Sequence, residues 1–220
     1  MFFQKRNKNS LHLAEINHDI TGRPYQIEAI QRVGERFEEG HREALLIMAT
    51  GTGKTRTAIS IVDVLQRYSW AKRVLFLADR NALVKQAYDN FATHLPNNPI
   101  VNLVKEKNDD AARIVFSTYK TILNQIEKLE EGHRKFDVGY FDLVIIDEAH
   151  RSVYNKYQII FEYFDSLLLG LTATPVMEVN RDTYETFKTE QGVPTFAYEL
   201  DTAVSEGYLK PPRKISVPSK

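Results

Sequence analysis

A glycine-containing turn follows directly on a short apolar run, and this feature constrains the fold of the chain more than any other. The run is Leu45-Leu46-Ile47-Met48, and the turn is Ala49-Thr50-Gly51-Thr52-Gly53-Lys54-Thr55. After the turn, apolar residues at i, i+3, i+4 and i+7 predict an amphipathic helix over residues 54–68. A buried strand that leads through a short turn into a helix is typical of α/β proteins with a parallel sheet.

The same alternation continues along the chain. Apolar runs predict strands at residues 44–49, 74–78, 101–104, 114–117, 143–147 and 167–172. Apolar residues at helical spacing predict helices at residues 24–40, 54–68, 81–91, 121–129 and 157–164. Because the strands show no polar alternation, we expect a doubly wound parallel sheet with helices on both faces. After Pro175 the pattern fades, apart from a short helix predicted at residues 200–205.

Composition limits the possible partners. The 29 basic and 29 acidic side chains give no net charge, so binding to nucleic acid would depend on a local basic cluster. The absence of cysteine excludes disulfides and thiolate chemistry. No apolar run reaches the roughly 18 residues that span a bilayer, and the first residues lack a secretory signal. We therefore expect a cytoplasmic protein without membrane contact.

The turn has the chemistry of a phosphate-binding loop. Gly51 and Gly53 let successive backbone N–H groups point inward, and the helix that follows adds its positive N-terminal end. Lys54 would reach the β- and γ-phosphates of a nucleotide, and the Thr55 hydroxyl would bind Mg²⁺. The pattern G-x-x-x-x-G-K-[ST] is incomplete, because Met48 stands at its first position. The competing interpretation is an ordinary glycine turn before a helix.

A second motif, Asp147-Glu148-Ala149-His150, ends the predicted strand at residues 143–147. We expect this strand to lie beside the strand of the phosphate loop, which suits Asp147 as a ligand of Mg²⁺. Glu148 then lies where a base could orient an attacking water. Two solvated acids at a strand end, or a metal site that includes His150, are the alternatives.

Several segments in order resemble the first, RecA-like motor lobe of superfamily 2 helicases and translocases. Residues 23–26 resemble the Q motif, 49–55 motif I, 147–150 motif II (a DEAH box) and 171–175 motif III. Residues 78–83 and 116–121 resemble the segments that touch the nucleic-acid backbone. Within the superfamily, residues 147–155 and 192–198 are most similar to the motor (R) subunit of type I restriction enzymes. The resemblance covers roughly residues 20–212.

The resemblance implies a set of roles. ATP and Mg²⁺ would be the cofactors, with the nucleotide held by Gln26 at the adenine and by Thr50, Gly51, Thr52, Gly53, Lys54 and Thr55 at the phosphates. Asp147 and Thr55 would bind the metal, while Glu148 and Lys54 would act in catalysis. Arg80, Thr118 and Lys120 would contact DNA, and His150, Thr172 and Thr174 would couple hydrolysis to movement.

The resemblance also implies an organisation and partners. Residues 1–20 are polar and show no period, so we expect an N-terminal arm or a truncation remnant there. An ATP-binding lobe is expected at 21–210 and a linker to a second motor lobe at 211–220. A nuclease domain is expected elsewhere, because its Glu-x-Lys or Gln-x-Lys pair does not occur here. Double-stranded DNA and the specificity and methylation subunits would be the partners. Without the arginine finger of a second lobe, this chain alone is expected to hydrolyse ATP very slowly.

Two other functions stay open. One is the first lobe of an RNA helicase or another superfamily 2 motor, which stimulation of hydrolysis by duplex DNA rather than RNA would exclude. The other is a nucleotide-dependent binding module without turnover, which has no need of a base such as Glu148.

Overall fold

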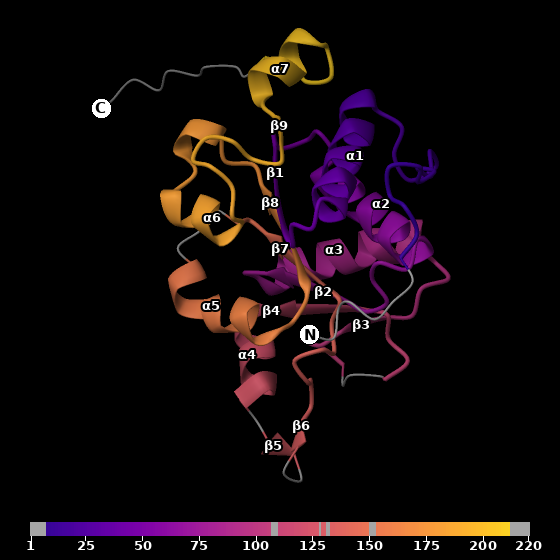
Figure 1. Cartoon of the computed structure of the whole chain (residues 1–220), viewed down its shortest axis with the longest axis vertical. Helices are drawn as coiled ribbons and strands as arrows, with labels where there is room; N and C mark the ends of the chain where they lie inside the picture. The colour runs from indigo at the N-terminus through magenta and orange to yellow at the C-terminus, as the bar shows by residue number, and fades with distance from the viewer. Residues whose placement is uncertain (1–7, 107–109, 128, 131–132, 150–152, 212–220) are drawn as a thin grey trace, which may run out of the picture.

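The computed structural model describes residues 8–106, 110–127, 129–130, 133–149 and 153–211. Its main sheet has seven strands, all parallel, in the order β3-β4-β2-β7-β8-β1-β9 (Figure 1). They are β1 (Glu43–Met48), β2 (Val74–Ala78), β3 (Ile100–Asn102), β4 (Ile114–Thr118), β7 (Leu143–Asp147), β8 (Leu167–Thr172) and β9 (Phe196–Tyr198). A separate antiparallel pair is formed by β5 (Leu129–Glu130) and β6 (His133–Arg134).

Helices cover both faces of the sheet (Figure 1). On one face lie α1 (Pro24–Glu38), α2 (Lys54–Arg67) and α3 (Asn81–His94). On the other lie α4 (Tyr119–Glu127), α5 (Val153–Tyr163) and α6 (Arg181–Thr186). A 3₁₀ turn (Val176–Glu178) and α7 (Leu200–Ser205) complete the order. The prediction of a doubly wound α/β fold is therefore confirmed.

Burial on two faces explains why the strands are apolar without alternation. Leu46 and Met48 of β1 pack with α1, α2 and α3, whereas Leu45 and Ile47 pack with the opposite helix layer. All four side chains are at most 1% exposed. Since successive side chains of a strand point to opposite faces, a strand between two helix layers must be apolar at every position.

The segment that we expected to be an N-terminal arm is packed against the domain from residue 8 onward. Leu11 and Ile20 are buried in the core beside α1 and α2. The Leu11 N–H donates to Glu38 Oε1 over 2.6 Å, and Trp70 Nε1 donates to the Asn9 carbonyl over 2.8 Å. Buried side chains and hydrogen bonds with Glu38 and Trp70, which lie far along the chain, hold a segment that has no period of its own.

The region after Pro175 contains a 3₁₀ turn, a helix and a strand that the sequence pattern did not reveal. The helix α6 is only six residues long, and the strand β9 only three. β9 pairs in parallel with β1 at the edge of the sheet, with Leu46 opposite Phe196. The short helix α7 lies at residues 200–205, as predicted. No helix in the described ranges is long and apolar enough to cross a membrane.

Gly170 lies in the central strand β8 at a close contact between layers. A Cβ at this position would lie 2.3 Å from Cζ of Phe187, which is fully buried. We expect Gly170→Ala to lower the free energy of unfolding by about 1–3 kcal/mol, the usual cost of overpacking a core. Urea unfolding of both proteins measures this change. Gly22→Ala is the matched control, because its Cβ would meet nothing closer than 3.7 Å.

Candidate nucleotide-binding site

The turn after β1 has the backbone conformation of a phosphate-binding loop. Gly51 and Gly53 adopt φ angles of 87° and 90°, in the left-handed region that favours glycine. The Thr52 hydroxyl donates to the Ala49 carbonyl over 2.6 Å and is fully buried, which closes the turn from inside. Thr50 and Gly51 remain exposed at its tip. The loop therefore exposes its backbone to solvent, while the hydrogen bond that closes the turn is buried.

The helix α2 begins at Lys54 directly after this turn. No side chain caps its first turn, so the N–H groups there can bind an anion. Lys54 and Thr55 are both half-buried in this first turn. At Gly53, the cap residue, a Cβ would lie 2.3 Å from Nε2 of Gln26, so a side chain there would displace Gln26 from its place beside the loop.

Lys54 contacts both acids of the second motif. Its Nζ lies 3.3 Å from Asp147 Oδ1 and 3.0 Å from Glu148 Oε1. The three side chains are 15–25% exposed, so the contact is reachable from solvent. Carboxylate oxygens suit Mg²⁺, and an ammonium beside free helix N–H groups suits a phosphate. The residues present thus fit a nucleotide with its metal ion.

The expectation that the two motif strands are neighbours was wrong. β8 lies between β1 and β7 and pairs with both. The motifs still meet, because parallel strands end at one edge of the sheet and the Lys54 side chain is long. Strand order depends on which strands pair, which the local pattern of a strand does not specify.

Glu148 has an uncommon backbone conformation. Its φ is 60°, in the left-handed region that a residue with a side chain rarely adopts. Bonds on either side hold it there: the Glu148 N–H donates to Asp147 Oδ1, and the Ala149 N–H donates to the Leu171 carbonyl over 2.9 Å. Strained residues of this kind cluster at functional sites, where the surrounding structure fixes a side-chain direction.

Gln26, predicted to contact adenine, is buried and bonded to the phosphate loop. Its Nε2 donates to the Thr52 carbonyl over 3.0 Å, and its Oε1 accepts a hydrogen bond from the Thr21 hydroxyl. With 3% exposure it does not lie on a polar outer face of α1. In this structure Gln26 supports the loop, and its contact with adenine stays a prediction.

An aromatic group around the loop was not found from the sequence. Tyr25 stacks on Tyr198 of β9, with ring centroids 3.8 Å apart, and meets the edge of Tyr208 at 5.0 Å. The Tyr25 hydroxyl donates to the Thr52 carbonyl over 2.8 Å. Burial, and then the hydrogen bond to Glu206, raise the pKa of Tyr198, so its hydroxyl stays neutral. Both stacked tyrosines lie in segments that the sequence analysis singled out, Tyr25 in residues 23–26 and Tyr198 in residues 192–198, but their contact could not be seen there.

The end of the described chain also reaches the loop. Leu209 Cδ2 lies 3.3 Å from the point that a Cβ of Gly51 would occupy. The Ala49 N–H donates to the Tyr198 carbonyl over 2.9 Å. Residues from both ends of the domain therefore hold the phosphate loop.

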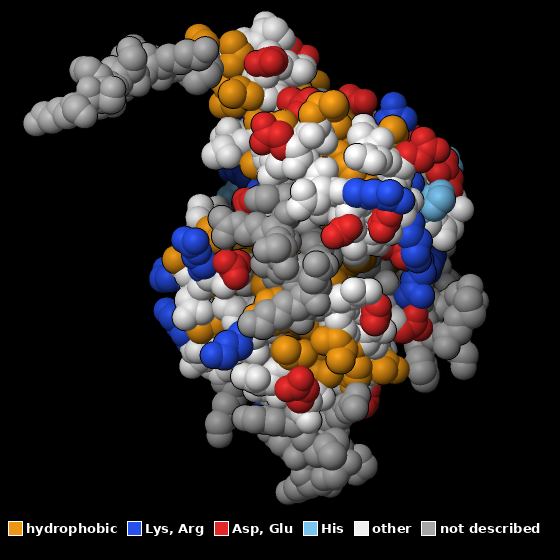
Figure 2. Space-filling view, turned by 90° about the vertical axis from the view of Figure 1, so that its left-hand side faces the viewer, with side chains coloured by type: hydrophobic (Ala, Val, Ile, Leu, Met, Phe, Trp, Pro, Cys, Tyr) orange, Lys and Arg blue, Asp and Glu red, His pale blue; other side chains and the backbone are white. Residues whose placement is uncertain are grey.

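The three residues predicted to contact DNA lie at the carboxyl ends of the strands, as the phosphate loop does. Arg80 follows β2, Thr118 ends β4, and Lys120 follows β4. Arg80 and Lys120 are exposed. Thr118 is 8% exposed, and its hydroxyl accepts a hydrogen bond from the Thr121 N–H at the start of α4. Thr118 therefore serves as a helix cap in this structure, while its contact with DNA stays a prediction. On the face shown in Figure 2, basic and acidic side chains are both spread over the surface.

Two of the residues predicted to couple hydrolysis to movement lie next to the acidic motif. Thr172 is fully buried at the end of β8, and its Oγ1 accepts a hydrogen bond from the Thr174 N–H. The neighbouring Leu171 carbonyl holds Ala149, so the backbones of the two motifs are in direct contact. His150 lies outside the described residues.

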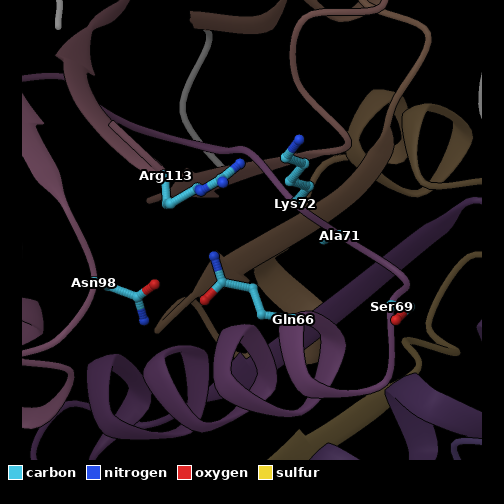
Figure 3. A pocket seen from close by; sticks show the side chains of 6 residues that line it. All are labelled: Gln66, Ser69, Ala71, Lys72, Asn98 and Arg113. Carbon is cyan, nitrogen blue, oxygen red and sulfur yellow. The ribbon is translucent and has the colours of Figure 1, made fainter. Parts of the chain in front are cut away.

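A cavity of about 330 Å³ opens at the opposite ends of the strands, among residues that precede β2, β3 and β4 (Figure 3). It is lined by Gln66, Ser69, Ala71, Lys72, Asn98 and Arg113. Ligands of open α/β sheets bind at the carboxyl ends of the strands. This cavity is therefore separate from the candidate site.

The fold and the site define a class of protein. A phosphate loop between β1 and α2, with an acidic pair at the end of β7 and a third motif at the end of β8, is the arrangement of a superfamily 2 phosphate-loop motor domain. A family model described as "Type III restriction enzyme, res subunit" matches residues 19–177, and the chain belongs to this family. Its relatives identify it more closely as the motor region of a type I restriction R subunit.

Three relatives illustrate the similarity. The EcoAI type I restriction endonuclease subunit of Escherichia coli is 36% identical, over 89% of this chain and 24% of its own. The EcoKI endonuclease subunit of Escherichia coli strain K12 is 31% identical, over 85% and 17%. A structure of a fragment assigned as an HsdR subunit of a type I restriction enzyme from Vibrio vulnificus YJ016 is 31% identical. Its TM-score is 0.68, over 90% of this chain and 34% of that one. The chain thus spans a quarter or less of the two Escherichia coli subunits and about a third of the Vibrio vulnificus chain.

Proposed function

We propose that this domain binds ATP with Mg²⁺ and hydrolyses it as part of a motor that moves on double-stranded DNA. The observation that carries the proposal is the contact of Lys54 with both Asp147 and Glu148, directly beside a phosphate loop. A cation and two carboxylates at the N-terminus of a helix are the groups that a metal-bound triphosphate needs.

In this proposal each group of the site has its own task. The N–H groups of the loop and of the first turn of α2 would bind phosphate oxygens, together with Lys54. Asp147 and Thr55 would hold Mg²⁺, which supplies charge neutralisation to the phosphates when it is bound. Glu148 would orient the attacking water and accept its proton. The backbone conformation of Glu148 is held by hydrogen bonds, and its carboxylate contacts Lys54.

The similarity to type I restriction endonuclease subunits supports two parts of the proposal. One is that the motor moves on DNA, and the other is that it acts within a restriction complex. In that complex we expect specificity and methylation subunits as partners, and a second motor lobe and a nuclease domain in the complete subunit. A lobe of RNA helicase type is the alternative, and stimulation of hydrolysis by RNA instead of duplex DNA would favour it.

Removal of the metal tests the site in the purified chain. We expect ATP to bind in the presence of Mg²⁺ and its affinity to fall on the order of tenfold or more when EDTA is added. The reason is that one contact between charged groups is worth about 1.5–3 kcal/mol, and 1.4 kcal/mol is tenfold in affinity. Titration calorimetry measures both affinities. The proposal is wrong if ATP does not bind, and the metal assignment is wrong if EDTA changes nothing.

A further inference from the structure

Tyr119 connects the residues predicted to contact DNA with the acidic motif. It is the first residue of α4 and lies between Thr118 and Lys120, two of the residues predicted to contact DNA. Its hydroxyl donates to the carbonyl of Asp147 over 3.3 Å. Since β2 lies between β4 and β7, this bond reaches across the end of one strand to the acidic motif.

The Tyr119 side chain is held firmly. It is 3% exposed, and its ring stacks on Tyr157 of α5 with a centroid distance of 5.3 Å. The edge of Phe161, also on α5, meets the same ring at 6.4 Å. A ring packed on two sides moves only with the helices that hold it, so a displacement of the start of α4 would reach the Asp147 carbonyl.

The hydroxyl lies in buried surroundings close to three acidic side chains. Burial raises the pKa of Tyr119 well above its usual value, and the charges of Asp147, Asp79 and Glu148 raise it further.

We propose that Tyr119 is a positioning residue that couples contact with DNA at the start of α4 to the placement of Asp147 and Glu148. The inference rests on the proposed function, because it assigns a regulatory connection to the same site. DNA that draws Thr118 or Lys120 toward it would shift the first turn of α4. The hydroxyl would pass this shift to the strand end that carries both carboxylates.

The coupling can be measured as a ratio of two affinities. The affinity of the purified chain for a slowly hydrolysed Mg²⁺-ATP analogue is determined without DNA and with duplex DNA raised to saturation. We expect the two values to differ about 5- to 150-fold in the unchanged protein, the usual range of coupling between sites. In Tyr119→Phe, which keeps the ring and loses only the hydroxyl, we expect the ratio to fall to within about twofold of one.

Tyr163→Phe is the matched control. Its hydroxyl also donates to a backbone carbonyl, that of Phe136, over 2.7 Å, and it lies on α5 away from the phosphate loop. This variant should keep the ratio of the unchanged protein. Thermal melting of both variants checks that each is folded.

The outcomes separate this proposal from the function on which it rests. If the unchanged protein binds nucleotide but DNA leaves its affinity unaltered, or if Tyr119→Phe keeps the full ratio, the coupling role is wrong and the nucleotide site stands. An equal loss of the ratio in Tyr163→Phe would also overturn it. If the unchanged protein binds no nucleotide, both proposals fail.

Discussion

Lys54→Ala is expected to abolish detectable binding of Mg²⁺-ATP. The substitution removes the ammonium that would contact the phosphates and that meets both carboxylates of the acidic motif. The contacts of this ammonium with the β- and γ-phosphates would be lost. At about 1.5–3 kcal/mol for each contact between charged groups, the loss would weaken binding of the nucleotide on the order of 10² or more. Titration calorimetry of both proteins gives the two affinities.

Lys85→Ala provides the control for this substitution. Lys85 is exposed on α3 and forms an ion pair with Asp89 one turn further along the same helix. Its loss should leave the affinity for nucleotide unchanged, since an exposed pair of this kind contributes little. Equal affinity in Lys54→Ala and the unchanged protein would remove Lys54 from the site.

Glu148→Gln is expected to keep ATP binding and to lose hydrolysis by a factor of about 10² or more, the usual contribution of a general base. Glutamine has the size of glutamate, and its carbonyl oxygen can still accept a hydrogen bond from Lys54. It cannot accept the proton of the attacking water. The rate of phosphate release in the complete motor, with duplex DNA present, measures the loss.

Glu35→Gln makes the same chemical change on the exposed surface of α1 and should leave the rate unaltered. Unchanged turnover in Glu148→Gln would exclude Glu148 as the base. A parallel loss of binding and turnover would instead mean that Glu148 acts in holding the nucleotide.

Most of the fold could be predicted from the sequence, because its central strands are buried on both faces. β2 and β8 have the predicted boundaries, Val74–Ala78 and Leu167–Thr172. Burial on two sides forces an unbroken apolar run, and such a run is visible in the sequence alone. The phosphate loop was equally visible, because a left-handed backbone at residues 51 and 53 favours glycine.

The short and edge elements could not be predicted in the same way. β9 has three residues and obtains its place from pairing with β1, which lies about 150 residues earlier. The segment from residue 8 to 20 is held by contacts with Glu38 and Trp70. Their stability comes from distant partners, so the local sequence carries little signal.

The sequence by itself determined the α/β class and the chemistry of the candidate site, because phosphate loops and acidic strand ends require particular residues at fixed spacing. Only the tertiary structure decided how these residues are supported. It placed β8 between the two motif strands. It also brought the side chains of Gln26 and Tyr25 into hydrogen bonds with the Thr52 carbonyl, and the Tyr119 hydroxyl into one with the Asp147 carbonyl. Each of these arrangements depends on strand order and on packing between segments far apart in the chain, and no local pattern of residues encodes either.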